Sequence, residues 1–205
     1  MNTHAPVPTV FIVDDDEAVR NSLCLLLKSL KLAAVAYGSA AEFLAAHNPE
    51  LPGCAVLDVR MPGMSGLELQ DRLMERRSPL PIVFITGHGD VPMAVEAMRH
   101  GAFEFLQKPF RDQELIDCIQ RAVARDLQNR AQLGEREQIL ARLKTLTSRE
   151  VEVLGLVTQG KANKVVAADL GISQRTVEVH RAHLMEKMGA SSLAQLVRMR
   201  MTIDG

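Results

Sequence analysis

Hydrophobic residues follow two different patterns along the chain, and the change from one to the other divides it near residue 125. Before that point, short continuous apolar runs alternate with stretches in which apolar residues recur at helical spacing. Apolar runs without alternating polar residues are typical of parallel strands that are covered on both faces. Five strand-then-helix units therefore predict a doubly wound (βα)5 domain of the α/β class. The expected strands are 10–13, 32–36, 54–57, 82–85 and 103–106.

Each expected strand leads into a stretch of helical spacing. In the first of these, apolar side chains recur on one face, as they do in a helix that packs against a sheet. A serine ahead of the second can accept a hydrogen bond from the first turn and cap the helix. The helices are expected at 17–30, from Ser39 to 47, after a loop at 61–66 up to 76, after a loop at 87–90 up to 100, and from Asp112 onward.

From residue 114 to residue 146 the pattern stays helical, is rich in Arg, Gln and Glu, and is interrupted by Gly134. We expect the last helix of the first domain, 9–125, to extend into a helical linker at 126–140. A coiled-coil section and a single long solvated helix both fit this composition. Beyond the linker, four short helical segments separated by glycines predict a small all-α four-helix domain over 141–205.

Composition and charge narrow the class of protein. The chain has 205 residues, of which 47% are hydrophobic and 24% charged, as in an ordinary folded protein. Its three cysteines lie far apart, which argues against a disulfide framework and favours a reducing cytoplasm. We find no apolar run of transmembrane length and no signal-peptide pattern, so we expect no membrane partner. The net charge of −1 conceals a mildly basic C-terminal part, with eight Lys/Arg and six Asp/Glu over 146–205, which is compatible with nucleic-acid binding.

Acidic and polar residues follow several of the expected strands. The carboxyl ends of parallel strands meet at one edge of a sheet, where ligands bind at the point at which the winding reverses. With the strand order 2-1-3-4-5, the first and third strands are neighbours at that point, and their carboxylates converge. Three converging carboxylates repel one another and need a cation, and an all-oxygen site suits Mg²⁺. The residues at this edge are Asp14, Asp15 and Asp16 after the first strand, Asp58 after the third, Thr86 after the fourth and Lys108 after the fifth.

This group of side chains is equipped to accept a phosphoryl group. Asp58 is the expected nucleophile, while Mg²⁺ and Lys108 neutralise the charge on the transferred oxygens. A run of aspartates after a strand can also be a solvated turn or a helix cap, and Asp16 is expected to cap the first helix.

Four segments, in order and at suitable spacing, resemble the receiver domains of bacterial two-component response regulators, and the third resembles the FixJ branch in particular. They are Val13-Asp-Asp-Asp16, Leu57-Asp-Val-Arg-Met-Pro62, Thr86-Gly-His-Gly-Asp-Val-Pro-Met93 and Lys108-Pro109-Phe110. The resemblance implies that a partner sensor histidine kinase phosphorylates Asp58. It implies no enzymatic activity beyond the Mg²⁺-dependent self-phosphorylation and autodephosphorylation of that residue.

The same resemblance implies a metal site and a switch. Mg²⁺ would be bound by Asp15, Asp58 and the backbone carbonyl of Arg60, with Asp14 acting through water. Thr86 would move toward the phosphoryl group while an aromatic side chain, here Phe105, turns inward. Many receivers have tyrosine at this position, so a step that needs a phenolic hydroxyl does not carry over. The Lys108–Pro109 bond resembles the cis peptide of the family.

The segment 163–182 has the spacing of a helix-turn-helix. Ala167 lies four residues before Gly171, which suits a tight turn, and Ser173 can cap the second helix. A generic helical bundle has similar spacing, so the motif alone does not establish DNA binding. The apolar residues expected between the two helices are Val166, Leu170, Ile172 and Val177.

Over 141–205 the chain resembles the LuxR-type DNA-binding domain. The residues that carry this resemblance are Leu146 to Glu150, Val153, Leu154, Gly160, Asn163, Lys164, and Ile172 through His180, with Lys187 and Met188. It implies base contacts from Glu178, Val179 and Ala182, and phosphate contacts from Lys164, Arg175, Thr176 and Arg181, with Lys187 as a further candidate. Relatives often have basic residues at the places of Glu178 and Ala182. A carboxylate at 178 can accept from a cytosine amino group instead of reading guanine.

Together these features predict a cytoplasmic transcription regulator of the NarL/FixJ type that binds double-stranded promoter DNA and cooperates with RNA polymerase. Phosphorylation is expected to produce a homodimer through the face that carries Val91, Val95 and Met98. Two other readings stay open. A phosphohydrolase of the haloacid-dehalogenase type would be phosphorylated on Asp14, because Asp14-x-Asp16 fits its motif. A vestigial receiver would work without phosphate.

Overall fold

The structure is a computed structural model, and it describes residues 6–87 and 91–204. The chain divides after Arg130 into two compact units. Within the described ranges, no helix has both the length and the apolar character needed to cross a membrane. Most of the loop expected at 87–90, and the first five residues of the segment inspected for a signal peptide, lie outside the described residues.

The first unit is built on a five-stranded parallel sheet with the order β2-β1-β3-β4-β5, which confirms the predicted topology. Val13 of the first strand pairs with Leu57 of the third, so the carboxyl ends of these two strands are neighbours. The observed strands lie within two residues of the expected ones. They are β1 Thr9–Val13, β2 Ala33–Tyr37, β3 Gly53–Asp58, β4 Ile82–Thr86 and β5 Glu104–Gln107.

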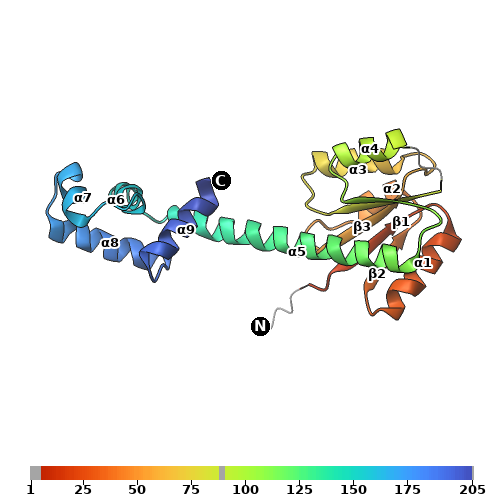
Figure 1. Cartoon of the computed structure of the whole chain (residues 1–205), viewed down its shortest axis with the longest axis horizontal. Helices are drawn as coiled ribbons and strands as arrows, with labels where there is room; N and C mark the ends of the chain where they lie inside the picture. The colour runs from red at the N-terminus through yellow and green to blue at the C-terminus, as the bar shows by residue number, and fades with distance from the viewer. Residues whose placement is uncertain (1–5, 88–90, 205) are drawn as a thin grey trace. The chain divides into compact units, whose positions relative to one another are not determined.

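Helices cover both faces of this sheet (Figure 1). The predicted caps are present, since the Asp16 side chain accepts from the Ala18 N–H and the Ser39 side chain accepts from the Glu42 N–H. A capping box between Ser65 and Glu68 begins the third helix. The helices are α1 Glu17–Ser29, α2 Ala40–Ala46, α3 Gly66–Glu75, α4 Val91–Arg99 and α5 Asp112–Leu143.

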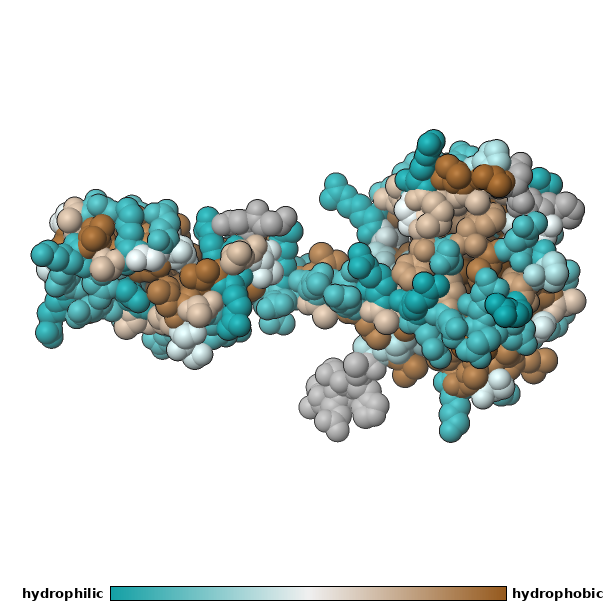
Figure 2. Space-filling view, viewed as in Figure 1, coloured by the Kyte–Doolittle hydropathy of each residue, from teal (hydrophilic) through white to brown (hydrophobic). Residues whose placement is uncertain are grey.

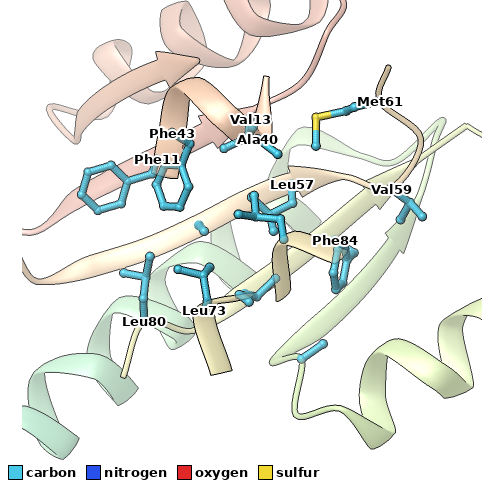
Figure 3. Packing of buried hydrophobic residues seen from close by; sticks show 14 of the residues in the cluster. Phe11, Val13, Ala40, Phe43, Leu57, Val59, Met61, Leu73, Leu80 and Phe84 are labelled. Carbon is cyan, nitrogen blue, oxygen red and sulfur yellow. The ribbon is translucent and has the colours of Figure 1, made fainter. Parts of the chain in front are cut away.

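Two apolar cores lie on the two faces of the sheet. One joins the strands to α2, α3 and α4, with Phe11, Phe43 and Phe84 among its buried side chains (Figure 3). The other joins the strands to α1 and α5 through residues such as Leu27 and Ile119. Because both faces are covered, the strands read as continuous apolar runs.

Helix α5 is continuous through the expected linker, and Gly134 does not interrupt it. A single glycine inside a helix costs about 0.5–1 kcal/mol relative to alanine, which a 32-residue helix anchored at other positions tolerates. Leu115 and Ile119 belong to the core of the first unit, whereas Ile139 belongs to the core of the second. One helix therefore supplies core residues to both units.

The second unit is the predicted helical domain. A capping box between Thr147 and Glu150 opens its first helix. Gly171, at φ 64°, ends the helix before the turn, and the Ser173 side chain accepts from Thr176 N–H to start the next helix. Val166 and Val177 are fully buried, as expected for the contact between these two helices. After the end of α5, the helices are α6 Ser148–Thr158, α7 Asn163–Leu170, α8 Gln174–Met188 and α9 Leu193–Asp204.

Candidate functional site

The acidic pocket forms where β1 and β3 end side by side. Asp14 and Asp58 are buried, and the ammonium of Lys108 lies between them. Lys108 Nζ is 2.9 Å from Asp14 Oδ2 and 3.2 Å from Asp58 Oδ1. The structure therefore brings together three of the residues that the sequence placed at this edge. Thr86, at the end of β4, is also buried.

Asp15 differs from the buried Asp14 and Asp58 because it is exposed. Among the residues that the structure describes, no three His, Cys, Asp or Glu side chains are grouped closely enough to hold a metal ion on their own. The protein groups that converge are thus two buried carboxylates and a lysine.

Backbone N–H groups orient both buried carboxylates. Asp58 Oδ2 accepts from Arg60 N–H at 2.7 Å, and Asp14 Oδ1 accepts from Asp16 N–H at 2.9 Å. The guanidinium of Arg20 donates to the Asp14 carbonyl at 2.7 Å, which fixes the backbone there. These contacts use one oxygen of each carboxylate for orientation and leave the other facing Lys108.

Gly66 is a pocket residue that the sequence reasoning did not identify. A Cβ at this position would lie 2.2 Å from the carbonyl oxygen of Asp58, so only glycine lets the start of α3 approach β3. Its N–H donates to the Val59 carbonyl at 2.9 Å. The only sequence signal was the glycine at the end of the loop at 61–66, which also fits an ordinary turn.

Burial and charge set the proton affinities of the pocket. Burial raises the pKa of Asp58, and the Lys108 ammonium and the Arg60 N–H only partly oppose that rise. Burial alone lowers the pKa of Lys108, but the hydrogen bond and charge of Asp14, together with Asp58, raise it overall. The negative charge of Asp58 is therefore incompletely balanced, and a further cation at this place is favourable.

The donor set fits a hard divalent cation. Asp14 and Asp58 supply carboxylate oxygens, and the Arg60 carbonyl accepts no hydrogen bond from the described residues. Oxygen ligands at the end of a buried strand pair, open to water on the side of exposed Asp15, are what Mg²⁺ prefers.

The predicted switch residues lie on adjacent strands. Phe84 pairs in register with Phe105, whose partly buried ring has its centroid 6.2 Å from that of Phe84. The N–H of Lys108 donates to the carbonyl of Thr86 at 2.8 Å, which links the end of β4 to the pocket lysine. The Lys108–Pro109 peptide is cis, as expected.

Three apolar side chains of α4 face outward. Val91, Val95 and Met98 are 78%, 43% and 44% exposed, and we call them the α4 apolar surface. Figure 2 shows apolar side chains gathered over this helix. Core packing of α4 is carried by Ala97, which is fully buried, so it does not account for these three residues.

The residues expected to contact DNA lie on α7 and α8, and all but Lys187 fall into two groups. Lys164, Arg175, Glu178, Val179 and Ala182 are exposed. Thr176 and Arg181 are partly buried and hydrogen-bonded, to Ser173 Oγ at 2.7 Å and to Asn163 Oδ1 at 2.5 Å respectively.

Lys187 is engaged within its own domain. Its Nζ is 2.7 Å from Oε2 of Glu150, whose side chain is buried. The Lys187 ammonium, followed by the Thr147 N–H, lowers the pKa of Glu150 to about 2. Lys187 therefore has a structural partner that the sequence reasoning did not foresee.

Comparisons with known proteins match both units. A family model of the response regulator receiver domain matches residues 10–120, and one of the luxR family of bacterial regulatory proteins matches residues 144–200. Nodulation protein W of Bradyrhizobium diazoefficiens is 49% identical over 95% of this chain and 86% of its own length. The transcriptional regulatory protein FixJ of Rhizobium meliloti is 49% identical over 93% of this chain and 94% of its own length.

Solved structures of response regulators also match the chain over both units. The response regulator StyR matches with a TM-score of 0.86 and 46% identity, over 95% of this chain and 98% of its own. Full-length FixJ of B. japonicum matches with a TM-score of 0.59 and 41% identity, over 96% and 97% of the two chains. The chain therefore belongs to the two-component response regulators of the NarL/FixJ type, in which a receiver domain and a LuxR-type helix-turn-helix domain regulate transcription by phosphorylation-dependent DNA binding.

Proposed function

We propose that Asp58 is the residue on which this regulator accepts a phosphoryl group from a sensor histidine kinase. The observation that carries the proposal is the placement of the Asp58 carboxylate, oriented by the Arg60 N–H and held 3.2 Å from Lys108. An Asp58 oxygen attacks phosphorus, the bond from phosphorus to the donor breaks, and the leaving atom keeps the electron pair. Lys108 is placed to stabilise the negative charge of the transferred oxygens.

Magnesium is the cofactor that this pocket suits. Asp15, Asp58 and the Arg60 carbonyl would hold it, with Asp14 acting through water, and it would supply positive charge opposite the phosphoryl oxygens. Asp15 is exposed, so its carboxylate has to turn toward the other ligands when the ion binds. We propose no enzymatic activity beyond self-phosphorylation and autodephosphorylation of Asp58.

Incubation of the protein with acetyl phosphate and Mg²⁺ tests whether Asp58 accepts the phosphoryl group. Intact-mass spectra of the wild-type protein should show one added phosphoryl group, and peptide mapping should place it on Asp58. The Asp58→Asn variant should fold and remain unlabelled, because the amide lacks the nucleophilic oxygen. A label mapped to Asp14 would favour the phosphohydrolase reading, and an unlabelled wild-type protein would favour the vestigial receiver.

The α4 apolar surface is the proposed dimer contact of the phosphorylated protein. Exposed apolar side chains grouped on one helix often mark an interaction site. Thr86 and Phe105, on the strands beside this helix, would couple it to the pocket. Thr86→Ala should then accept phosphate but show a weakened shift to the dimer, as measured by sedimentation with beryllofluoride, a phosphoryl mimic.

Helix α8 is the proposed recognition helix, which enters the major groove of DNA. Glu178, Val179 and Ala182 would contact base edges, and Lys164, Arg175, Thr176 and Arg181 would contact phosphates. Lys187 would join them only by leaving Glu150. In a two-fold dimer the half-sites should lie about 10 bp apart, or a multiple of that. We also propose contact with RNA polymerase and a cytoplasmic location, where promoter DNA is found.

Binding-site selection at fixed salt tests the orientation of α8. Glu178→Ala should change the preferred base at one position by about 1–3 kcal/mol, because a specific acceptor is lost. Identical preferences for the wild-type protein and Glu178→Ala would show that this residue does not read a base.

A further inference from the structure

A side-chain hydrogen bond joins the two helices of the helix-turn-helix. Arg181, at the middle of α8, donates through one terminal nitrogen to Oδ1 of Asn163 at 2.5 Å. Asn163 is the first residue of α7, and both side chains are partly buried. The bond therefore fixes one edge of the Arg181 guanidinium against the neighbouring helix.

The start of α7 does not account for this asparagine. Asparagine commonly begins helices as the N-cap residue, where its side chain accepts from the first turn. Here the N-cap residue is Ala162, and no side chain caps the helix. The amide oxygen of Asn163 is instead directed to Arg181, so the contact with α8 is its observed role.

The neutral acceptor leaves the positive charge of Arg181 intact. Three other basic side chains of this domain are paired with carboxylates: Lys161 with Asp169, Lys187 with Glu150 and Arg149 with Glu152. Arg181 has no carboxylate partner among the described residues. An arginine has five N–H donors, so an amide oxygen can orient the guanidinium while most donors remain available to an anion.

We propose that Asn163 is a positioning residue that presents Arg181 to a DNA phosphate. The inference rests on the proposed phosphate contact of Arg181 and adds a role for Asn163. Ordering the guanidinium before DNA arrives reduces the side-chain entropy that binding would otherwise lose. One well-placed hydrogen bond has a net effect of about 1 kcal/mol, which is a change of about fivefold in affinity.

A double-mutant cycle in the full-length protein tests this role. The variants are Asn163→Ala, Arg181→Ala and the two combined, measured against a duplex selected from a random pool by the wild-type protein. Asn163→Ala should weaken binding about fivefold and keep the salt dependence, because the charge of Arg181 remains. Arg181→Ala should reduce the salt slope by about one, and adding Asn163→Ala to it should cause no further loss.

Asn163→Asp distinguishes two roles for Asn163: orienting Arg181 for DNA, or only stabilising the contact between α7 and α8. A carboxylate at this place should hold Arg181 at least as firmly, so the midpoint of thermal unfolding should not fall. It also neutralises the guanidinium, so DNA affinity should fall further than in Asn163→Ala and the salt slope should decrease by about one. A structural clamp alone predicts instead that affinity follows thermal stability across these variants.

Gln195→Ala is the matched control, because it removes a polar contact of the same domain, to Ser191, outside the helix-turn-helix. It should leave DNA affinity unchanged. The positioning role would be overturned if Asn163→Ala left DNA affinity unchanged. It would also be overturned if Asn163→Ala weakened binding equally in the wild-type protein and in Arg181→Ala. Unchanged affinity in Arg181→Ala would instead refute the proposed phosphate contact itself.

Discussion

His47 is partly buried at the end of α2, where its ring contacts two phenylalanine rings. Its ring stacks on Phe43 with centroids 4.8 Å apart and meets Phe11 edge-on at 5.1 Å. Neither ring nitrogen has a hydrogen-bond partner among the described residues. Burial, reinforced by the charges of Arg130 and Arg76, lowers the pKa of His47. The folded receiver domain therefore disfavours the protonated form of this histidine.

Acid should destabilise the receiver domain through His47. In the unfolded chain the histidine binds a proton as pH falls through about 6.5, whereas the folded protein resists protonation until lower pH. The stabilisation that comes from keeping His47 neutral is complete above the unfolded-state pKa of about 6.5, and it is lost as pH falls toward the folded-state pKa. Urea unfolding between pH 5 and 8 should show this loss, and His47→Phe should remove it.

His183 supplies the control for that experiment, because it is exposed and lies in the other domain. His183→Gln should leave the pH dependence of receiver unfolding unchanged. The same slope in His47→Phe and in the wild-type protein would assign the acid sensitivity to other groups.

At the residue scale, sequence reasoning found the groups whose position follows from strand ends. Asp14 and Asp58 come directly after apolar runs and Lys108 follows another after one residue, so the parallel topology brings them together. The role of Gly66 and the ion pair of Glu150 with Lys187 were not found, because each depends on a partner in another element. The residues next to Gly66 also fit an ordinary turn, and those next to Glu150 indicate only the capping box with Thr147, which the structure contains.

At the element scale, helix α5 is fastened to the sheet by a buried carboxylate. Asp126 is fully buried and accepts from Gly53 N–H at 2.8 Å and from Arg130 Nε at 2.7 Å. The two terminal nitrogens of Arg130 donate to the carbonyls of Pro49 and Leu51 at 2.9 and 3.1 Å. The loop before β3 is thereby tied to α5.

Asp126→Ala should destabilise the receiver domain by about 3 kcal/mol, because it leaves the Gly53 N–H and the Nε–H of the charged Arg130 without their shared acceptor. Denaturant unfolding measures the change. Arg125→Ala, on the exposed side of the same turn, should be nearly neutral. Equal small effects of the two substitutions would show that the buried contact contributes little.

Gly134→Ala should stabilise the protein by about 0.5–1 kcal/mol, since alanine favours the helix and a Cβ there meets nothing within 4 Å. Gly155→Ala is the matched case, because Gly155 lies inside α6 and is equally unobstructed. Denaturant unfolding with helix content followed by circular dichroism compares the two. A gain at 155 without one at 134 would mean that α5 is not helical at its glycine in solution.

The sequence predicted the elements themselves but not how α5 is held. Asp126 and Arg130, four residues apart in a highly charged stretch, have the spacing of an exposed helix pair. Their burial depends on Gly53, which is 73 residues away in the chain. Gly134 misled the sequence analysis in another way. A glycine in a helical stretch suggests a break, but α5 runs through this position without one because it is anchored elsewhere.

At the scale of the whole molecule, the α4 apolar surface should govern assembly. Val95→Asp places a charge among the exposed side chains of Val91 and Met98, so it should prevent the dimer induced by beryllofluoride while leaving the unphosphorylated monomer folded. Sedimentation with and without beryllofluoride measures the shift.

Leu25→Asp is the control, because Leu25 is 69% exposed on α1, on the other face of the sheet. It should dimerise as the wild-type protein does. If Val95→Asp still dimerises, the contact between copies lies elsewhere.

Sharing α5 between two cores has a practical consequence for dividing this protein. A receiver fragment that ends at residue 120, where the family match stops, would lack Asp126 and Arg130, so the start of β3 would lose its partners. A fragment ending after Arg130 retains them and should melt at a higher temperature. The helical domain likewise needs Ile139 from α5, together with Arg142, which donates to the Met188 carbonyl at 2.8 Å. Arg136 also donates to the Ile203 carbonyl of the helical domain, at 3.2 Å. An expression boundary that spares both halves therefore lies between residues 131 and 135, inside a helix rather than in a loop.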